Sequence, residues 1–537
     1  MSVPPPATGP TALRGVPSTP RAAIGPSDGW RVGSILLIAI SLGLHVAALV
    51  RAEPLRSAND RSRWATVRAL TERGDFRIDP YEFQRGWSTI DQVQIDGNLY
   101  STKPALLPIA AAAISLPVEA LTGWNLADDP APHTRWALLL LNLLPFAAAL
   151  WAVRGLLTDV ARTDLARFLA LGTLAFATPI SAFLPVFNNH TIAACCCALA
   201  AVPLVRIRLG TRNGVTFVAA GLFAALTVCN ELPAGLLGLG ALAVCWFADR
   251  RLTLTRFAPA AALPLALFAA STIWQTGSLR PFYLSYGTEA YEFVRHGRPS
   301  YWMNPTGLDA ARDGFWAYLF HCTFGHHGLF SLTPIWLLAA WGWGRGAVSL
   351  VRGKEEQNEP GTAEPTGAHP LDGFAAAVGL LSLGVLAFYL TRTENYNYGG
   401  TSVALRWMIW LAPLWALSLA PLADRFAGRR GFVPLAATLL TLSTASAWLD
   451  APNPWQHPWL MRALDGRGWI DYAAAAEPDS ADHAGVRRES DRGANPGALP
   501  PVREASTLSP PPGLPARFGS SSVSRSRPAL ASTEAGT

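Results

Sequence analysis

Apolar residues occur along this chain in long runs, each about the length of one membrane crossing, that polar segments separate. A helix crosses the hydrocarbon core of a bilayer with roughly 20 apolar residues. The runs lack the two-residue alternation of barrel strands, and unpaired backbone is too costly in hydrocarbon for other structures. The pattern therefore predicts an all-α, polytopic integral membrane protein with about 11 to 13 transmembrane helices. The runs cover 32–50, 104–121, 134–153, 165–186, 189–205, 214–231, 232–248, 257–275, 329–348, 373–390, 404–421 and 431–448.

The composition agrees with a membrane protein. Of the 537 residues, 50% are hydrophobic and only 15% are charged, and the mean hydropathy is +0.23. The formal charge of +6 accompanies apolar runs of span length, so we interpret it as charge that sets membrane topology. No basic run interleaved with aromatic residues indicates a nucleic-acid partner. The six cysteines show neither a disulfide framework nor the spacing of a zinc site, and they are predicted to be packing residues.

Basic residues gather in every second loop and orient the chain. By the positive-inside rule these loops are cytoplasmic, which places two long loops, 53–103 and 276–328, outside. Asn188 is also predicted to be outside, although three apolar runs separate it from the first outer loop. One of the proline-containing runs 104–121 and 165–187 must therefore be broken or re-entrant. The basic positions are Arg206, Arg208, Arg212, Arg250, Arg251, Arg256, Arg345, Arg352, Lys354, Arg425, Arg429 and Arg430.

Residues 31–450 are predicted to form the membrane domain. The segments before and after this domain contain few large apolar residues. Residues 1–30 are predicted to be a disordered cytoplasmic tail, and 451–537 an outer and mostly disordered tail. Residues 351–372 form a cytoplasmic linker. This organisation predicts a multi-pass protein of a bacterial-type cytoplasmic (inner) membrane whose site faces outward.

The stretch from Asn59 to Phe76, NDRSRWATVRALTERGDF, follows the first apolar run. Its apolar residues repeat at helical spacing and its charges occupy the other faces, which predicts an amphipathic helix on the outer surface of the membrane. Gly74 is expected to end this helix. Asp60 stands at the helix start, where a capping role and a catalytic role are both open.

This loop resembles the first outer loop of type-C membrane glycosyltransferases, the class of the dolichyl-phosphate-mannose protein mannosyltransferases and the lipid A aminoarabinose transferases. A weaker likeness continues to about Cys197. Some residues depart from the family pattern: Ala105 replaces a proline, and Asn59 and Asn188-Asn189-His190 stand where many relatives carry carboxylates. The matching residues are Asp60, Arg63-Trp64-Ala65, Arg68, Leu70, Gly74-Asp75, Gly97, Tyr100, Lys103-Pro104 and Leu106.

The resemblance implies a glycosyltransferase that moves a sugar from a polyprenyl-phosphate carrier to a lipid, glycan or protein acceptor on the outer face. It implies Asp60 as the catalytic base, with Arg63, Tyr100 and Lys103 binding substrate. The chemistry agrees, because such a transfer needs a base for the acceptor and a cation for the departing phosphate. Interfacial snorkelling of Lys103 and an aromatic-belt position of Tyr100 are the alternatives. No cofactor is predicted, and the departures at the acidic positions give a divalent metal no support.

Further candidate residues stand near the predicted outer ends of apolar runs. His190 and Glu231 either position sugar hydroxyls or face interfacial water. Adjacent histidines such as His326 and His327 lack the spacing of a closed metal site, so phosphate or sugar contact is the preferred interpretation. Arg406 lies inside a run and needs an anion, either a lipid phosphate or the carboxylate of Glu394 or Glu231.

Two rival interpretations remain. One is a transporter or flippase for a lipid-linked or anionic substrate, and the other is a relative that has kept the fold and lost catalysis. The candidate residues gather on one predicted side of the membrane, whereas a transporter should expose its charges to both sides. We therefore favour the enzyme, with a polyprenyl-phosphate sugar donor, an acceptor and membrane lipids as partners, and with no nucleic acid.

Overall fold

A computed structural model describes residues 26–358, 369–392, 397–451 and 453–472, and the statements below concern these residues. The chain is mostly helical, and eight helices are long and apolar enough to cross a membrane, which confirms the all-α, polytopic class. Most of both predicted tails, the middle of the 351–372 linker and Glu394 lie outside the described residues. The eight are Asp28–Arg51, Pro130–Val160, Asp164–Phe183, Asn189–Arg208, Arg250–Thr276, Asp372–Leu390, Arg406–Phe426 and Phe432–Leu449.

Each apolar run predicted from the sequence is helical in the structure. Three of these helices are shorter than the eight candidate spans: α3, α9 and α10. The elements that make up the membrane domain are α1 (Asp28–Arg51), α3 (Leu106–Thr122), α4 (Pro130–Leu138), α5 (Leu144–Val160), α6 (Asp164–Phe176), α7 (Ile180–Phe183), α8 (Asn189–Arg208), α9 (Gly214–Asn230), α10 (Gly235–Ala248), α11 (Arg250–Leu252), α12 (Ala258–Thr276), α13 (Phe315–Thr323), α14 (Leu329–Leu332), α15 (Trp336–Asn358), α16 (Asp372–Leu390), α17 (Ala412–Phe426), α18 (Phe432–Leu449) and α19 (Trp459–Asp465).

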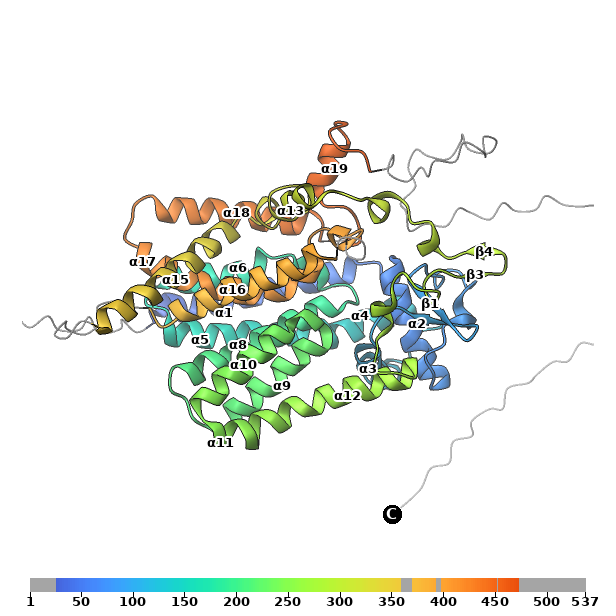
Figure 1. Ribbon diagram of the computed structural model, residues 1–537, viewed down its shortest axis with the longest axis horizontal. Coiled ribbons are helices and arrows are strands. Elements are labelled where there is room, and N and C mark those ends of the chain that lie inside the picture. The colour runs from blue at the N-terminus through green and yellow to red at the C-terminus, as the bar shows by residue number, and fades with distance from the viewer. Residues whose placement is uncertain (1–25, 359–368, 393–396, 452, 473–537) are drawn as a thin grey trace, which may run out of the picture. The chain divides into compact units, whose positions relative to one another are not determined.

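The core lies around α8 and α17. Protein buries 89% of the span that contains α8 and 94% of the span that contains α17, against 17% for α18 and 28% for α1. The central helix α8 packs against α5, α9 and α17, and α17 also packs against α6, α15 and α16. Helices that are apolar on all sides are buried or face lipid, so the exposed apolar side chains of outer helices such as α1 and α18 suit contact with lipid. In Figure 1 the helices α5, α6, α8, α16 and α18 run along the long axis of the bundle.

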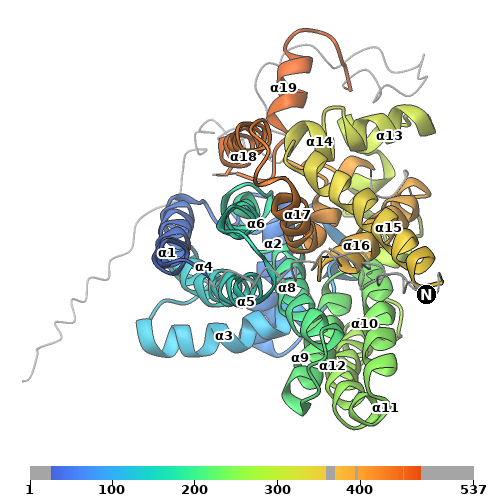
Figure 2. The same cartoon turned by 90° about the vertical axis from the view of Figure 1, so that its left-hand side faces the viewer.

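The helix α3 lies across the bundle and not along it. Figure 2 looks nearly along the axes of α1, α6 and α17, and shows α3 from the side. Both ends of α3 belong to the same end of the bundle: Leu126, which follows it, packs in one cluster with Trp64, and Arg135 Nη2 donates to the carbonyl of Ala52, 3.1 Å away. The run 104–121 thus begins and ends at the same end of the bundle, which agrees with the predicted topology, in which one run does not cross.

The run 165–187 is broken, as its prolines predict. The helix α6 ends at Phe176 and the short helix α7 begins at Ile180, with Pro179 between them. Proline has no N–H to donate and clashes with the preceding turn. The break leaves an irregular segment inside the protein, where Asn142 Nδ2 donates to the carbonyls of Leu184 and Val186. Backbone groups that the helix no longer pairs are thus satisfied by a side chain.

The loop after α1 contains α2 (Ala58–Arg73) and a hairpin of β1 (Gln92–Ile95) and β2 (Asn98–Ser101). The N-cap is Ser57, whose Oγ accepts from the Asp60 N–H, while the Asp60 carboxylate accepts from the same hydroxyl over 2.9 Å. Asp60 is therefore the third residue of the helix and not its cap, in a reciprocal arrangement typical of helix starts. Gly74 ends the helix at φ +70°, as predicted.

Protein encloses α2 on more than one face. Every residue from Ser62 to Ala69 is buried, which differs from the amphipathic surface helix predicted from the sequence. The polar face is buried because its groups find partners: Ser62 bonds to the carbonyl of Asp91, and Arg68 pairs with Glu72 at 2.6 Å. A position of α2 on the outer membrane surface thus stays a prediction.

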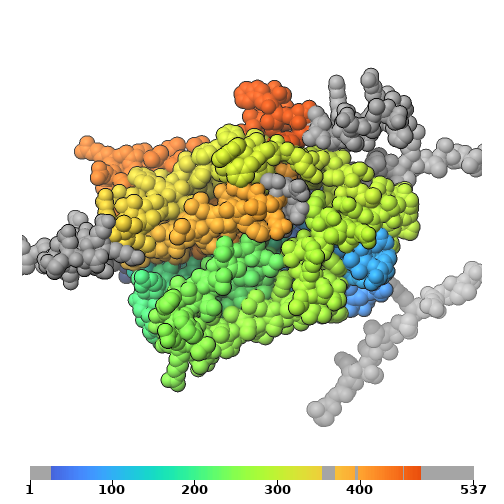
Figure 3. All heavy atoms as spheres, in the orientation of Figure 1, coloured from blue at the N-terminus to red at the C-terminus, as the bar shows by residue number. Residues whose placement is uncertain are grey.

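The second long loop packs on the first. It carries a small hairpin of β3 (Val294–Arg295) and β4 (Arg298–Pro299). Arg295 pairs with Asp79 at 2.8 Å and with Glu82 at 3.0 Å, and Gln94 N–H donates to the Ala290 carbonyl. In the space-filling view the second loop lies against the first-loop residues (Figure 3). The two loops together form a cap at the end of the bundle opposite α11 (Figure 1).

Candidate functional site

Asp60 is buried where α2 meets the segment before α8. Its Oδ1 accepts from the Phe187 N–H at 3.1 Å, and its Oδ2 accepts from Ser57. The residue is 1% exposed. Burial raises the pKa of Asp60 to about 6, although Ser57, Arg63 and Phe187 all favour its ionised form. Both carboxylate oxygens are thus engaged within the protein.

Arg63, one turn after Asp60, connects α2 to the start of α8. Its guanidinium donates to Asn59 Oδ1 at 3.0 Å and to Asn189 Oδ1 at 2.7 Å, and both acceptors are uncharged amides. Burial lowers the pKa of Arg63 to about 10, because the nearby carboxylates only partly offset the loss of hydration. The charge of this buried guanidinium is therefore not cancelled by the two amides it contacts.

Asn189 and His190 begin α8 and both contact Glu231, which lies between α9 and α10. Asn189 Nδ2 donates to Glu231 Oε1 at 2.8 Å, and His190 Nδ1 forms a short hydrogen bond with the same oxygen. All three side chains sit in the same place because the N-cap of α8 meets the C-cap of α9. The structure therefore brings together His190 and Glu231, which the sequence analysis treated as separate candidates.

Lys103 forms an ion pair with Asp91, with its Nζ 2.6 Å from Asp91 Oδ2. Asp91 also accepts from the Thr102 hydroxyl. Burial lowers the pKa of Lys103 to about 8, Asp91 opposes this, and repulsion from Arg63 and Arg406 adds to it. Burial alone would raise the pKa of Asp91, but Lys103, Thr102 and Arg63 outweigh it, so this pKa is lowered. Lys103 is thus a half-buried cation with an anionic protein partner.

Arg406 opens a 3-10 turn, Arg406–Leu411, that leads into α17. Its guanidinium carbon lies 5.3 Å from the centre of the Trp455 ring, in a cation–π arrangement. A Cβ atom on Gly400 would lie 3.3 Å from Asp309 Oδ1 and 3.7 Å from Arg406 Nη2, so the acid and the arginine flank the same glycine. Electrostatic repulsion from Arg406 reaches both Arg63 and Lys103.

These contacts define a charge cluster, by which we mean Asp60, Arg63, Asp91, Lys103, His190, Glu231, Asp309 and Arg406. Its members come from α2, the first hairpin, the starts of α8 and α17, the end of α9 and the second loop. Asp60, Arg63, Lys103, His190, Glu231 and Arg406 were predicted as site residues from the sequence. Within the described ranges, no three His, Cys, Asp or Glu side chains gather in a way suited to a metal ion.

Other predicted residues lie elsewhere. Tyr100 lies on β2, and its ring packs against the ring of Phe282, with ring centres 5.6 Å apart. His326 and His327 form a second group: their Nδ1 atoms are 2.5 Å apart, and His326 Nε2 lies 2.7 Å from the Tyr472 hydroxyl. The structure thus separates Tyr100 and the two histidines from the predicted base and cations.

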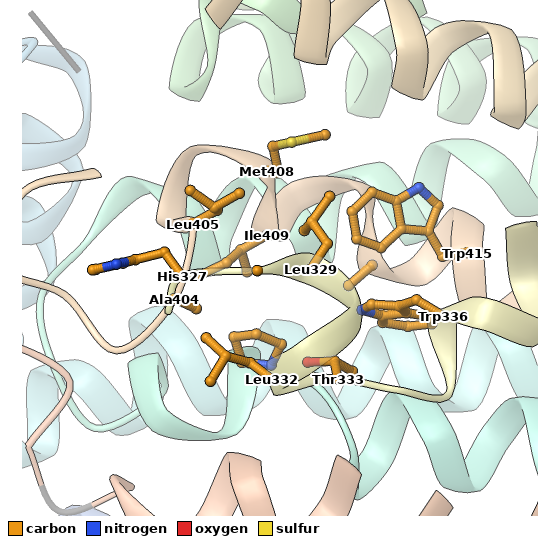
Figure 4. Close-up of a pocket in the computed structure, with 13 residues that line it drawn as sticks. His327, Leu329, Leu332, Thr333, Trp336, Ala404, Leu405, Met408, Ile409 and Trp415 are labelled. Atoms are coloured by element: carbon orange, nitrogen blue, oxygen red, sulfur yellow. The ribbon is translucent and has the colours of Figure 1, made fainter. Parts of the chain in front are cut away.

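A separate pocket lies between α14, α15 and the turn before α17 (Figure 4). It encloses about 310 Å³ between atoms, and apolar side chains form most of its wall. The imidazole of His327 points away from the other labelled side chains. No member of the charge cluster lines it, so we do not assign the transfer chemistry to this pocket. The lining includes Leu329, Leu332, Thr333, Trp336, Leu405, Met408, Ile409 and Trp415.

Sequence reasoning missed Asp91 and Asp309. For Asp91 a signal was present: Asp96-Gly97 is the preferred dipeptide of a two-residue hairpin turn, and both residues have positive φ, +49° and +79°. The resulting register pairs Gln92 with Ser101, which places Asp91 beside the residue before Lys103. For Asp309 we find no comparable signal, because it reaches the cluster through an irregular loop.

Comparison with known proteins adds no relative. No protein-family model matches the chain, and no curated protein sequence matches it.

Proposed function

We propose that this protein is a glycosyltransferase that moves a sugar from a polyprenyl-phosphate carrier to a lipid, glycan or protein acceptor. The observation that carries the proposal is the meeting of Arg63, Lys103 and Arg406 within one charge cluster that also holds Asp60 and His190. The three cations come from distant parts of the chain. Departure of a polyprenyl phosphate needs such cations, because negative charge develops on the leaving oxygen.

The three cations supply complementary contacts for a phosphate. A guanidinium can match two phosphate oxygens with a planar pair of donors, and Lys103 has a compact point charge. Both Nη atoms of Arg63 also donate to Asn59 and Asn189, so a phosphate would share Arg63 with these amides. Lys103 already holds one anionic partner, the carboxylate of Asp91. A phosphate that approaches Lys103 would share it with this carboxylate.

The site would face the outside of a cytoplasmic membrane. Arg250 and Arg251 of α11 follow one of the apolar runs whose basic flanks we assign to the cytoplasmic side, and α11 lies at the end of the bundle opposite the cap (Figure 1). The positive-inside rule then places the cap outside, with α2 close to the outer surface of the membrane. This orientation suits a donor whose lipid tail stays in the bilayer while its sugar phosphate enters the charge cluster.

Two residues are candidates for the base that deprotonates the acceptor. Asp60 is the one implied by the resemblance to type-C glycosyltransferases. His190 is the other, because its imidazole is held by Glu231 within the same cluster. Enzymes use both carboxylates and imidazoles as general bases.

The test is release of lipid phosphate by the purified protein in nanodiscs. We would supply undecaprenyl-phosphate mannose, glucose, galactose and arabinose, each with a labelled sugar, and a membrane lipid and glycan extract as acceptor. Wild type is expected to release undecaprenyl phosphate from at least one donor and to transfer its label. Lys103→Gln and Arg406→Gln should each lower the rate about 100-fold. The control Arg298→Gln changes an exposed hairpin arginine and should leave the rate unchanged.

The transporter interpretation gives a different result in the same preparation. A flippase reconstituted in vesicles would move the labelled lipid across the bilayer without breaking the bond between sugar and phosphate. Movement of intact donor, with no release of undecaprenyl phosphate, would contradict the proposed transferase.

A further inference from the structure

We propose that His190, oriented by Glu231, takes the proton from the acceptor hydroxyl, and that Asp60 acts as a positioning residue. The inference rests on the proposed transferase function and assigns one role within it. It departs from the resemblance, which implies the carboxylate of Asp60 as the base. We choose His190 over Asp60 because the protein surrounds the polar atoms of these two side chains differently.

The protein encloses Asp60, so a substrate has little access to its carboxylate. Oδ1 accepts from the Phe187 N–H and Oδ2 accepts from Ser57, and the residue is 1% exposed. A general base must come within hydrogen-bond reach of the proton it removes. The contacts of Asp60 instead fix the segment that leads into α8, which is the task of a positioning residue.

His190 has the opposite arrangement. Its Nδ1 contacts Glu231 Oε1, and when Glu231 is ionised its carboxylate can only accept, so that Nδ1 then carries the hydrogen. In the neutral imidazole the lone pair then lies on Nε2, the other polar atom of the ring. The His190 side chain keeps 10% of its surface accessible. The imidazole is therefore partly accessible, whereas the protein encloses the carboxylate of Asp60.

The dyad is held rigidly from both sides. Asn189 Nδ2 donates to the same oxygen of Glu231 at 2.8 Å, and the N-cap Asn188 accepts from the Thr191 N–H at 2.8 Å and so fixes the first turn of α8. A base whose second nitrogen is bonded to a carboxylate has its ring orientation set, and the imidazolium that forms is stabilised. Glu231 therefore acts through His190.

His190 also lies among the phosphate-binding cations. Arg63, Lys103 and Arg406 all exert an electrostatic effect on it. A phosphate held by these three groups would keep the sugar carbon that reacts close to the acceptor oxygen and to Nε2. Proximity of this kind turns a bimolecular step into one within a single complex.

The transfer forms one bond at the anomeric carbon and breaks another. The acceptor oxygen forms a bond to the anomeric carbon, and its proton passes to Nε2 of His190. The bond between the anomeric carbon and the phosphate oxygen breaks, and the electron pair leaves with the polyprenyl phosphate, which Lys103, Arg63 and Arg406 hold. The imidazolium then returns its proton to water.

The experiment compares variants of the purified protein in the lipid-phosphate release assay. His190→Gln should lower kcat about 100-fold with little change in the donor KM, which is the size expected for a lost general base. Asp60→Asn should lose less than about tenfold, because the Asn oxygen still accepts from the Phe187 N–H and its amide group bonds to Ser57. Added imidazole should restore part of the activity of His190→Gly. Glu231→Gln should lower kcat about tenfold with the donor KM unchanged.

The control is His296→Gln, which changes a histidine at a hairpin turn whose side chain is 59% exposed. Thermal unfolding in detergent shows that each variant is folded. A His190→Gln variant as active as wild type, together with an inactive but folded Asp60→Asn, would overturn the inference and leave the transferase standing. If wild type released no undecaprenyl phosphate from any of the four donors, the proposed function would fail, and the inference with it.

Discussion

The Phe187 N–H donates to the Asp60 carboxylate over 3.1 Å, across 127 positions of the sequence. This bond joins α2 to the irregular segment that follows the break at Pro179. Trp64, one turn after Asp60, packs on the Phe187 ring with ring centres 4.6 Å apart. The start of α8, and with it His190, is thereby held against the first loop.

The raised pKa of Asp60 predicts how stability depends on pH. The group has a pKa of 3.8 when unfolded and about 6 when folded, because burial disfavours the charge. The folded state therefore binds the proton more tightly, so the stabilising effect is complete below pH 3.8 and is lost as pH rises through 6. A shift of this size corresponds to roughly 3 kcal/mol. Wild type should lose stability relative to Asp60→Asn as pH rises from 3.8 to about 6.

Thermal unfolding of both proteins in the same detergent, at intervals of pH, measures this difference. Asp60→Asn is the reference for wild type, because its side-chain amide does not titrate. A wild type that gains stability over Asp60→Asn as pH rises would mean that its hydrogen bonds outweigh burial and that the folded pKa lies below 3.8.

The ion pair of Lys103 and Asp91 predicts non-additive effects on stability. Removal of either partner leaves an uncompensated buried charge, so Asp91→Asn and Lys103→Met should each cost about 3 kcal/mol. The double variant leaves no such charge, so its loss should be clearly smaller than the sum of the two single losses. Unfolding by SDS, followed through tryptophan fluorescence, gives the three values. Additive losses would show that the two charges do not interact.

The lowered pKa of Lys103 predicts a pH limit for donor binding. Its pKa is about 8 in the folded protein against 10.5 as the ordinary value, because burial disfavours the charged form. The ammonium group therefore loses its charge as pH rises through 8, and affinity for undecaprenyl phosphate should fall over the same range. In Lys103→Arg the fall should be absent up to pH 10, since a guanidinium keeps its proton. Binding measured by microscale thermophoresis in nanodiscs decides this, and parallel curves for the two proteins would exclude Lys103 as the group that titrates.

The helices could be predicted from the sequence because span-length apolar runs have few other solutions. All twelve runs contain helices, and the prolines of 165–187 predicted the break before α7. The parity of the arginine-rich loops also predicted that one run does not cross. The sequence did not tell which of the two candidate runs this is. A 17-residue apolar helix such as α3 can lie along the bundle or across it, and tertiary contacts decide between the two.

The site was predictable by residue type and less so by arrangement. Lys103 and Arg406 are charges beside or within apolar runs, which marks them as functional candidates. The bond of His190 to Glu231 depends on the packing of α8 on α9, which no local pattern specifies. The enclosure of α2 also depends on partners far away in sequence, since Arg63 and Ser62 look solvent-exposed when the helix is considered alone.

The close crossing of α9 with the start of α12 predicts opposite effects of two glycine substitutions. A Cβ atom on Gly221 of α9 would lie 2.3 Å from the carbonyl oxygen of Phe257, which belongs to a neighbouring backbone that cannot give way. Gly221→Ala should therefore cost about 3 kcal/mol or force the two helices apart, because overpacking of a close contact is destabilising. Gly240 of α10 has nothing within 4 Å of its Cβ position. Gly240→Ala should gain up to about 1 kcal/mol, since alanine is the better helix former. SDS unfolding of both variants measures the two effects. If Gly221→Ala proved as stable as Gly240→Ala, the close approach of α9 to Phe257 would be wrong.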